Sequence, residues 1–113
     1  MTKDEIMNMP AGREMDEAIA KCIMDIDVSI AGGNGGLYSW VKHYSTNLLA
    51  AFEVVDKMHK NEYQYTLRGH YMGVKQHIAT FDHQDWADAN PLYKAHGNTA
   101  AHAICRAALL ATL

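Results

Sequence analysis

Arg106 is the residue whose surroundings most clearly suggest chemistry, because it is the single cation in the run of small and apolar residues from Ala103 to Leu110. Alanine combines high helix propensity with little bulk, so this run predicts a helix that packs closely against a sheet or another subunit. If Ile104 lies at the centre of the buried stripe, helical spacing places Arg106 on the other side, beside His102. We therefore expect the guanidinium to point at solvent, a partner chain or an anion.

The second half of the chain also carries stacking groups and further cations. A purine needs one aromatic plane and a pyrophosphate needs a bidentate guanidinium, so this half could bind a nucleotide. Most of these rings are expected to lie in the core or at a subunit interface. The aromatic residues are Tyr63, Tyr65, Tyr71, Phe81, Trp86 and Tyr93, and the cations are Arg68, Lys75 and Arg106.

Metal binding and catalysis are not predicted. The seven histidines include no HExxH motif and no pair spaced i,i+4, and the two cysteines have no second ligand at motif spacing. No G-x-S-x-G motif is present for a nucleophile. The run from Asp82 to Asp85 could supply an acid and a base, but charges in a loop are usually solvated.

The glycine-rich segment 32–36 has two interpretations. Phosphate-binding loops use glycines to expose backbone N–H groups, so a phosphate cradle is one. However, no Gly-Lys-Ser/Thr follows, and the strand-like residues Leu37 to Val41 come next. The tip of a hairpin spanning 27–41 is the interpretation that the context favours.

The elements that would position these residues follow from hydrophobic spacing and capping signals. Helices show apolar residues at intervals of three and four, and strands show alternation. Ser45, Thr46 and Asn47 offer possible N-caps for one helix, and Asn98 or Thr99 for another. The expected elements are a helical turn over 3–7, helices over 12–24, 48–60 and the C-terminal run, a hairpin over 27–41, strands over 63–68 and 70–81 with a turn at Gly69, and an irregular loop over 82–97.

This order favours one α+β domain over residues 1–113, with an antiparallel β-sheet packed between helices in an α-β-α sandwich. The formal net charge of -3 shows no basic stripe, so we expect neither duplex nucleic acid nor a membrane surface as a partner. Cys22 and Cys105 are expected to be small core residues in a reducing compartment. No cofactor is predicted.

Three segments, in this order along the chain, resemble the phage ABA sandwich domain family. They are Met9 to Asp16, the Tyr44-Ser45-Thr46-Asn47 motif with the helix to Met58, and the closing run Ala103 to Leu110. The resemblance spans nearly the whole chain, from Met9 to Leu110. The resemblance implies a phage protein with helices on both faces of an antiparallel sheet, acting in the cytoplasm of the infected bacterial host.

Most members have no assigned role, and the best-understood relatives associated with this fold are anti-Thoeris proteins, which act as sponges for immune signals. The resemblance implies a homo-oligomer, a dimer or higher, that binds a small cyclic adenine nucleotide without cleaving it. The signal would be glycocyclic ADP-ribose from TIR enzymes, with cyclic oligonucleotides as a further class. On this basis Arg106 would contact phosphate or ribose, Phe81 would stack on adenine, and Asn90 would make a polar contact.

Two other functions stay open at this point. A phage protein could inhibit a host factor by direct protein–protein contact, which would not depend on Arg106. A nucleotide-cleaving enzyme could use His83 and Asp85 and would turn over its substrate. The absence of a catalytic motif favours the sponge, because capture needs stacking, charge and enclosure but no turnover.

Overall fold

The structure is a computed structural model that describes residues 1–26, 41–71, 75–83 and 93–113. The expected hairpin over 27–41 therefore lies outside the described residues except for its last position. The described elements are α1 (Lys3–Asn8), α2 (Arg13–Cys22), α4 (Leu48–Lys60), β1 (Tyr63–Tyr71), β2 (Lys75–His83), β3 (Tyr93–Gly97) and α5 (Ala100–Ala111).

The four helices agree with the sequence expectations, and side chains cap three of them. Thr2 caps α1, and Asn47 caps α4 by accepting from the backbone N–H groups of Leu49 and Ala50. Thr99 caps α5 by accepting from the backbone N–H of His102. These caps satisfy donors that the first turn of a helix leaves unpaired, which is why the helices begin at these residues.

The sheet has the strand order β1-β2-β3, and both pairs are antiparallel. Two local expectations were wrong. Gly69 is not the turn, because β1 continues through it and pairs it with His77 of β2. The expected loop over 82–97 contains β3, which pairs with β2 from the His77–Gly97 pair to the Phe81–Tyr93 pair.

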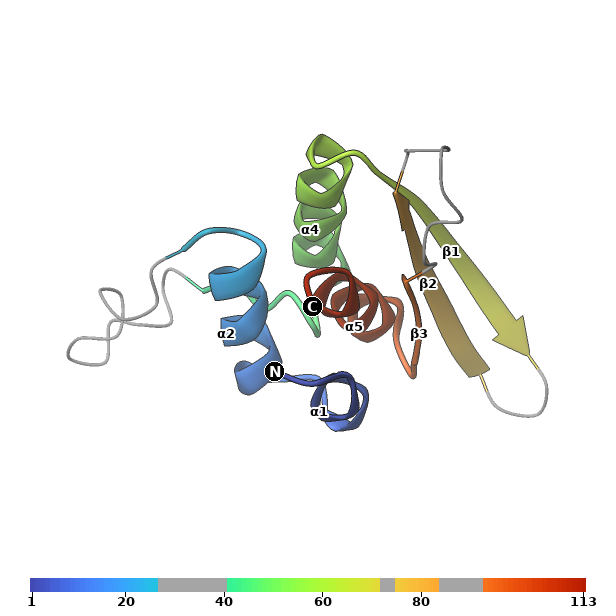
Figure 1. The fold of residues 1–113 in the computed structure, drawn as a ribbon. Helices are drawn as coiled ribbons and strands as arrows, with labels where there is room; N and C mark the ends of the chain where they lie inside the picture. The colour runs from blue at the N-terminus through green and yellow to red at the C-terminus, as the bar shows by residue number, and fades with distance from the viewer. Residues whose placement is uncertain (27–40, 72–74, 84–92) are drawn as a thin grey trace.

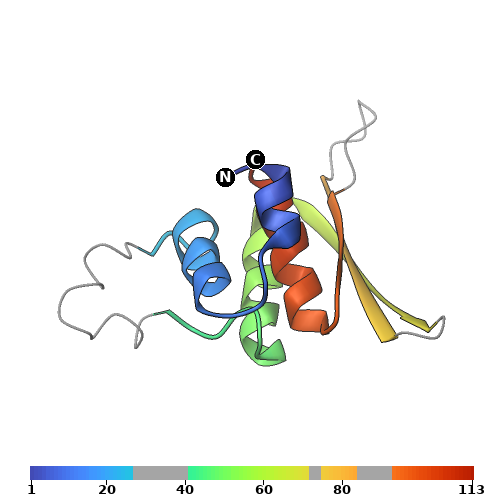
Figure 2. The ribbon, with the colours of Figure 1, turned by 90° about the horizontal axis from the view of Figure 1, so that it is seen from below.

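The helices form two layers on one side of the sheet (Figure 1). The helices α4 and α5 lie directly against the strands, and α1 and α2 pack on α5. Figure 2 shows the same order from a second direction. The α+β class with an antiparallel sheet and packed helices is confirmed. The expected arrangement had helices on both faces of the sheet, whereas the described helices all lie on one side of it, with α1 and α2 packed on the side of α5 away from the strands.

The helix α5 is the centre of the core. Every residue from Ala101 to Ala111 is buried except Arg106. The sequence predicted one buried stripe around Ile104, but His102 and Leu110 on the opposite side are buried as well, because the sheet covers α5 on one side and helices cover it on the others. A helix that is apolar nearly all round is expected in such a position.

Two further observations bear on the core and the surface. Cys105 is buried, as expected, but Cys22 is exposed. Burial raises the pKa of the Cys105 thiol. No helix among the described residues is long and apolar enough to cross a membrane.

Close packing of β3 on α5 predicts a strong effect of one methyl group. A Cβ at Gly97 would lie 2.6 Å from the backbone nitrogen of Ala103. We expect Gly97→Ala to lower the free energy of unfolding by about 1–3 kcal/mol, because the helix backbone must move. Gly69→Ala is the matched control, since its Cβ would meet no atom within 4 Å, and should change stability by less than about 0.5 kcal/mol. Urea denaturation measures both, and equal effects would contradict the packing argument.

Candidate functional site

Arg106 joins two distant segments of the backbone. Its Nη1 donates to the carbonyl oxygen of His96 at 2.9 Å, and its Nη2 donates to the carbonyl oxygen of Met9 at 3.3 Å. The side chain is partly exposed, and burial lowers its pKa. The sequence predicts solvent, a partner chain or an anion as the neighbour of the guanidinium, and the structure gives it two main-chain acceptors.

His102 lies one helical turn before Arg106 and also contacts the Met9 carbonyl group. Its Nε2 is 3.1 Å from the Met9 oxygen, so the ring donates a hydrogen bond there. Burial lowers the pKa of His102, and the nearby Arg106 charge adds to this effect, while the hydrogen bond to Met9 opposes it. We call the contact of Arg106 and His102 with this carbonyl the Met9 anchor. It fixes the segment between α1 and α2 onto α5.

The other two predicted ligand contacts lie elsewhere. Phe81 is fully buried on β2, and its ring centroid is 5.4 Å from that of Tyr65. The adenine of a nucleotide could reach the Phe81 ring only after the side chains that cover the ring had moved. Asn90 lies outside the described residues. The binding roles of all three residues stay predictions.

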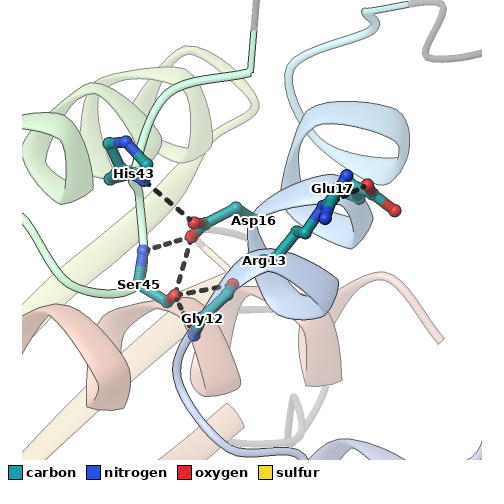
Figure 3. Close-up of polar contacts among 6 residues, drawn as sticks. All are labelled: Gly12, Arg13, Asp16, Glu17, His43 and Ser45. Atoms are coloured by element: carbon teal, nitrogen blue, oxygen red, sulfur yellow. Dashed lines mark hydrogen bonds and ion pairs between the residues drawn. The ribbon is translucent and has the colours of Figure 1, made fainter. Parts of the chain in front are cut away.

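A buried polar cluster that the sequence does not predict connects α2 to the segment before α4 (Figure 3). The Asp16 Oδ1 atom accepts from the backbone N–H of Ser45 at 2.8 Å and from its hydroxyl at 2.7 Å. The backbone N–H of Gly12 in turn donates to the Ser45 Oγ atom at 2.8 Å. We call Gly12, Asp16 and Ser45 the Asp16 cluster.

The geometry of the Asp16 cluster fits a structural role. Asp16 and Ser45 are only 3% and 0% exposed, and the hydrogen bonds satisfy their polar atoms. His43 approaches the second carboxylate oxygen of Asp16 at 3.7 Å, but its side chain is 79% exposed. A serine nucleophile needs a base and access to substrate. Ser45 has a carboxylate neighbour but no access.

No local sequence pattern predicts the Asp16 cluster. The apolar spacing of Met15, Ile19 and Ile23 predicts that Asp16 lies on the polar side of the helix over 12–24, and Ser45 is one of the three candidate N-caps. Their hydrogen bonds span 29 residues. Asn47 takes the cap, which leaves Ser45 free to turn inward.

The remaining chemical hypotheses concern the acid–base run and metal ligands. Asp82 lies on the face of the sheet away from the helices, where it lines a pocket of about 220 Å³ with Arg68 and Lys94. Asp85 and the side chain of His83 lie outside the described residues. Among the described residues, no group of three or more His, Cys, Asp or Glu side chains could hold a metal ion.

A family model described as the Phage ABA sandwich domain matches residues 17–109. The matched region includes α4, the whole sheet and α5 as far as Leu109. No curated protein matches the chain, and no solved structure matches it.

The Asp16 cluster predicts an unequal effect of two substitutions. Asp16→Ala removes the acceptor of two buried Ser45 donors, so we expect the free energy of unfolding to fall by about 1–3 kcal/mol or more. His43→Ala removes only an exposed partner and should cost less than about 0.5 kcal/mol. Chemical denaturation of both variants measures the difference. An Asp16→Ala variant as stable as the wild type would refute the structural role.

Burial of His102 predicts a pH dependence of stability. The pKa in the folded state lies below the ordinary value of 6.5, so the unfolded state takes up the proton first as the pH falls. The stability that neutral His102 contributes is therefore complete above about pH 6.5 and is lost progressively below it. We expect His102→Gln, which keeps an N–H donor, to flatten the stability curve between about pH 5 and pH 7.

The control for this titration is His59→Gln, because His59 is an exposed histidine near the end of α4. It should leave the slope of stability against pH close to that of the wild type. Thermal or urea unfolding across the pH series distinguishes the two variants. If His102→Gln retained the wild-type slope, another group would be responsible for it.

Proposed function

The chain belongs to the Phage ABA sandwich domain family, and from this premise we propose that it is a phage protein that captures a cyclic adenine nucleotide immune signal and holds it without cleaving it. The signal proposed first is glycocyclic ADP-ribose made by TIR enzymes. The observation that carries the proposal is the family match across α4, the sheet and most of α5.

The state of Arg106 supports a phosphate contact. A guanidinium has N–H donors on three nitrogens, and each Nη of Arg106 uses one for a backbone carbonyl. One N–H therefore remains on each Nη, and the side chain is partly exposed. Burial of the surrounding helix lowers the local dielectric, which strengthens attraction for an anion. The Met9 anchor also fixes the fork in one orientation, which reduces the entropy that binding would cost.

Capture requires affinity and no turnover, so no residue has a catalytic role in this proposal. A phage that must remove a trace signal benefits from stoichiometric binding. The signal should then be recovered intact when the protein is denatured. The proposal includes a homo-oligomer, in which a second copy could complete the enclosure of the ligand. The stacking role of Phe81 and the polar contact of Asn90 remain parts of this proposal.

The proposal predicts tight binding of the signal with recovery of the unchanged molecule. Isothermal titration with purified glycocyclic ADP-ribose should give a saturable binding curve, and heat denaturation should release a molecule of unchanged mass. Arg106→Lys keeps the charge but loses the fork, so we expect affinity to fall about tenfold or more. Arg68→Ala is the matched control, because Arg68 lies on the exposed face of β1, and should bind as the wild type does.

Melting curves of each variant separate lost binding from lost folding, since Arg106 also holds two backbone carbonyls. A bound ligand should raise the melting temperature of the wild type. Folded wild-type protein that binds none of the cyclic nucleotides, or that returns a product of altered mass, would refute capture. Recovery of a host polypeptide in place of a nucleotide would instead favour inhibition by direct contact.

A further inference from the structure

The face of the sheet that points away from the helices (Figure 1) carries a small pocket of about 220 Å³. Pockets for drug-sized molecules measure roughly 300–1,000 Å³, so this one suits a smaller ligand. Side chains from all three strands line it, namely Thr66, Arg68, Ile78, Thr80, Asp82 and Lys94. We call it the outer-sheet pocket. Its residues belong neither to the Met9 anchor nor to the Asp16 cluster.

The strand register brings hydroxyl groups and cations to the same part of this face. Thr66 pairs with Thr80, and Thr80 pairs with Lys94, so these three residues form one row across the sheet. Arg68 lies two residues further along β1, in the row of Ile78. Neighbouring strands are about 4.8 Å apart, and residues two apart along a strand are separated by roughly 7 Å. The long side chains of Arg68 and Lys94 can therefore reach the Thr80 hydroxyl from the two outer strands.

The outer-sheet pocket is positive although the chain as a whole is negative. Arg68 and Lys94 supply two positive charges against the one negative charge of Asp82, whereas the formal net charge of the chain is -3. The ion pairs in the described part of the chain join other residues, so neither cation is neutralised there by contact with a carboxylate. Two cations beside hydroxyl donors suit a phosphate group, which accepts charge-assisted hydrogen bonds at several oxygens.

Asp82 adds a second requirement on the ligand. It lies two residues beyond Thr80 on β2, on the side away from the row of Arg68 and roughly 7 Å along the strand. A carboxylate repels phosphate but accepts hydrogen bonds from hydroxyl groups. A ligand with a phosphate at one end and hydroxyl groups at the other therefore matches the order of charges along the pocket, and Ile78 offers its middle an apolar contact.

We propose that the outer-sheet pocket binds a small phosphomonoester that carries hydroxyl groups, such as a sugar phosphate. Arg68, Lys94 and the Thr80 hydroxyl contact the terminal phosphate, and Asp82 accepts from a hydroxyl group of the ligand. A phosphomonoester has a charge of about −1.5 to −2 at pH 7, which two cations balance.

The inference goes beyond the proposed function and does not depend on it. A cyclic nucleotide signal holds its phosphates as diesters within the ring, so it has no terminal phosphate to place between the two cations. The two ligands would therefore bind at different places, with Arg106 serving one and Arg68 the other.

An NMR titration of the full chain with ribose 5-phosphate tests the outer-sheet pocket, because amide shifts report both affinity and location. We expect saturable shifts at Thr66, Thr80 and Lys94, with an affinity about tenfold higher than for inorganic phosphate and no binding of ribose. Arg68→Gln and Lys94→Gln should each weaken the binding of ribose 5-phosphate at least tenfold, since each removes a cation. Both variants should stay folded, because both side chains are exposed.

Two further variants make the test specific. Lys60→Gln is the matched control, because Lys60 is an exposed lysine of α4, on the helical side of the sheet, and it should bind as the wild type does. Asp82→Ala should bind inorganic phosphate as well as the wild type or better, because a repulsive charge is lost. The preference for ribose 5-phosphate over inorganic phosphate should disappear in this variant.

Several results would overturn the inference. They are a folded wild type that does not bind ribose 5-phosphate, shifts confined to another face of the molecule, and cation variants that bind as the wild type does. A preference for ribose 5-phosphate that survives in Asp82→Ala would overturn the choice of a hydroxyl-bearing ligand. Displacement of ribose 5-phosphate by glycocyclic ADP-ribose would overturn the assignment of separate sites.

This inference and nucleotide capture fail separately. Binding of ribose 5-phosphate that is lost in Arg68→Gln, by a protein that binds no cyclic nucleotide, would support the outer-sheet pocket and refute capture. Binding of the cyclic nucleotide by a protein that ignores ribose 5-phosphate would refute the outer-sheet pocket and leave capture standing.

Discussion

The burial of α5 on nearly all sides is the constraint on which the rest of the structure depends. A helix surrounded by a sheet and by three other helices must be slim, and its alanines meet this condition because they let neighbouring backbones approach. Gly97 of β3 reaches the Ala103 backbone for the same reason. The strands, α4 and the α1–α2 layer each use a different face of this one helix, so their relative positions follow from it.

Arg106 is the exception in α5, and its environment explains how a cation is accommodated there. A buried charge is costly unless it is hydrogen-bonded. Here the carbonyl groups of His96 and Met9 accept from the two Nη atoms, while the buried Nε has no hydrogen-bond partner in the described part of the chain. The two contacts that offset part of the desolvation cost also tie the N-terminal segment and β3 to the helix. A ligand at Arg106 would therefore contact a group that already holds three parts of the fold in place.

The sequence predicted the features that local rules determine. α4 and α5 could be recognised because Asn47 and Thr99 are good N-caps and the apolar spacing after them is helical. β3 was not predicted because five residues that follow closely after a proline carry too little pattern, and pairing with β2 stabilises them. Gly69 predicts a turn because glycine is rare within strands, but it lies within β1, at the edge of the sheet, and pairs with His77.

The candidate site was less predictable, since its contacts join residues far apart in sequence. Arg106 was identified as unusual, but its acceptor at Met9 lies 97 positions away. The Asp16–Ser45 pair gave no local signal at all. Periodicity indicates which side of a helix is polar, but it does not identify the backbone carbonyl or carboxylate that will meet a side chain in the folded chain.

The two thiols of this chain occupy opposite environments, and this gives the protein an internal reporter. Cys22 is open to solvent, while Cys105 lies inside the central helix with its pKa raised by burial. An alkylating reagent can modify Cys22 in the native state. It reaches Cys105 only when α5 is uncovered, because burial blocks access to the thiol and disfavours the thiolate, which is the species that reacts. The ratio of singly to doubly modified chains, read by mass spectrometry, therefore measures how often the interior opens.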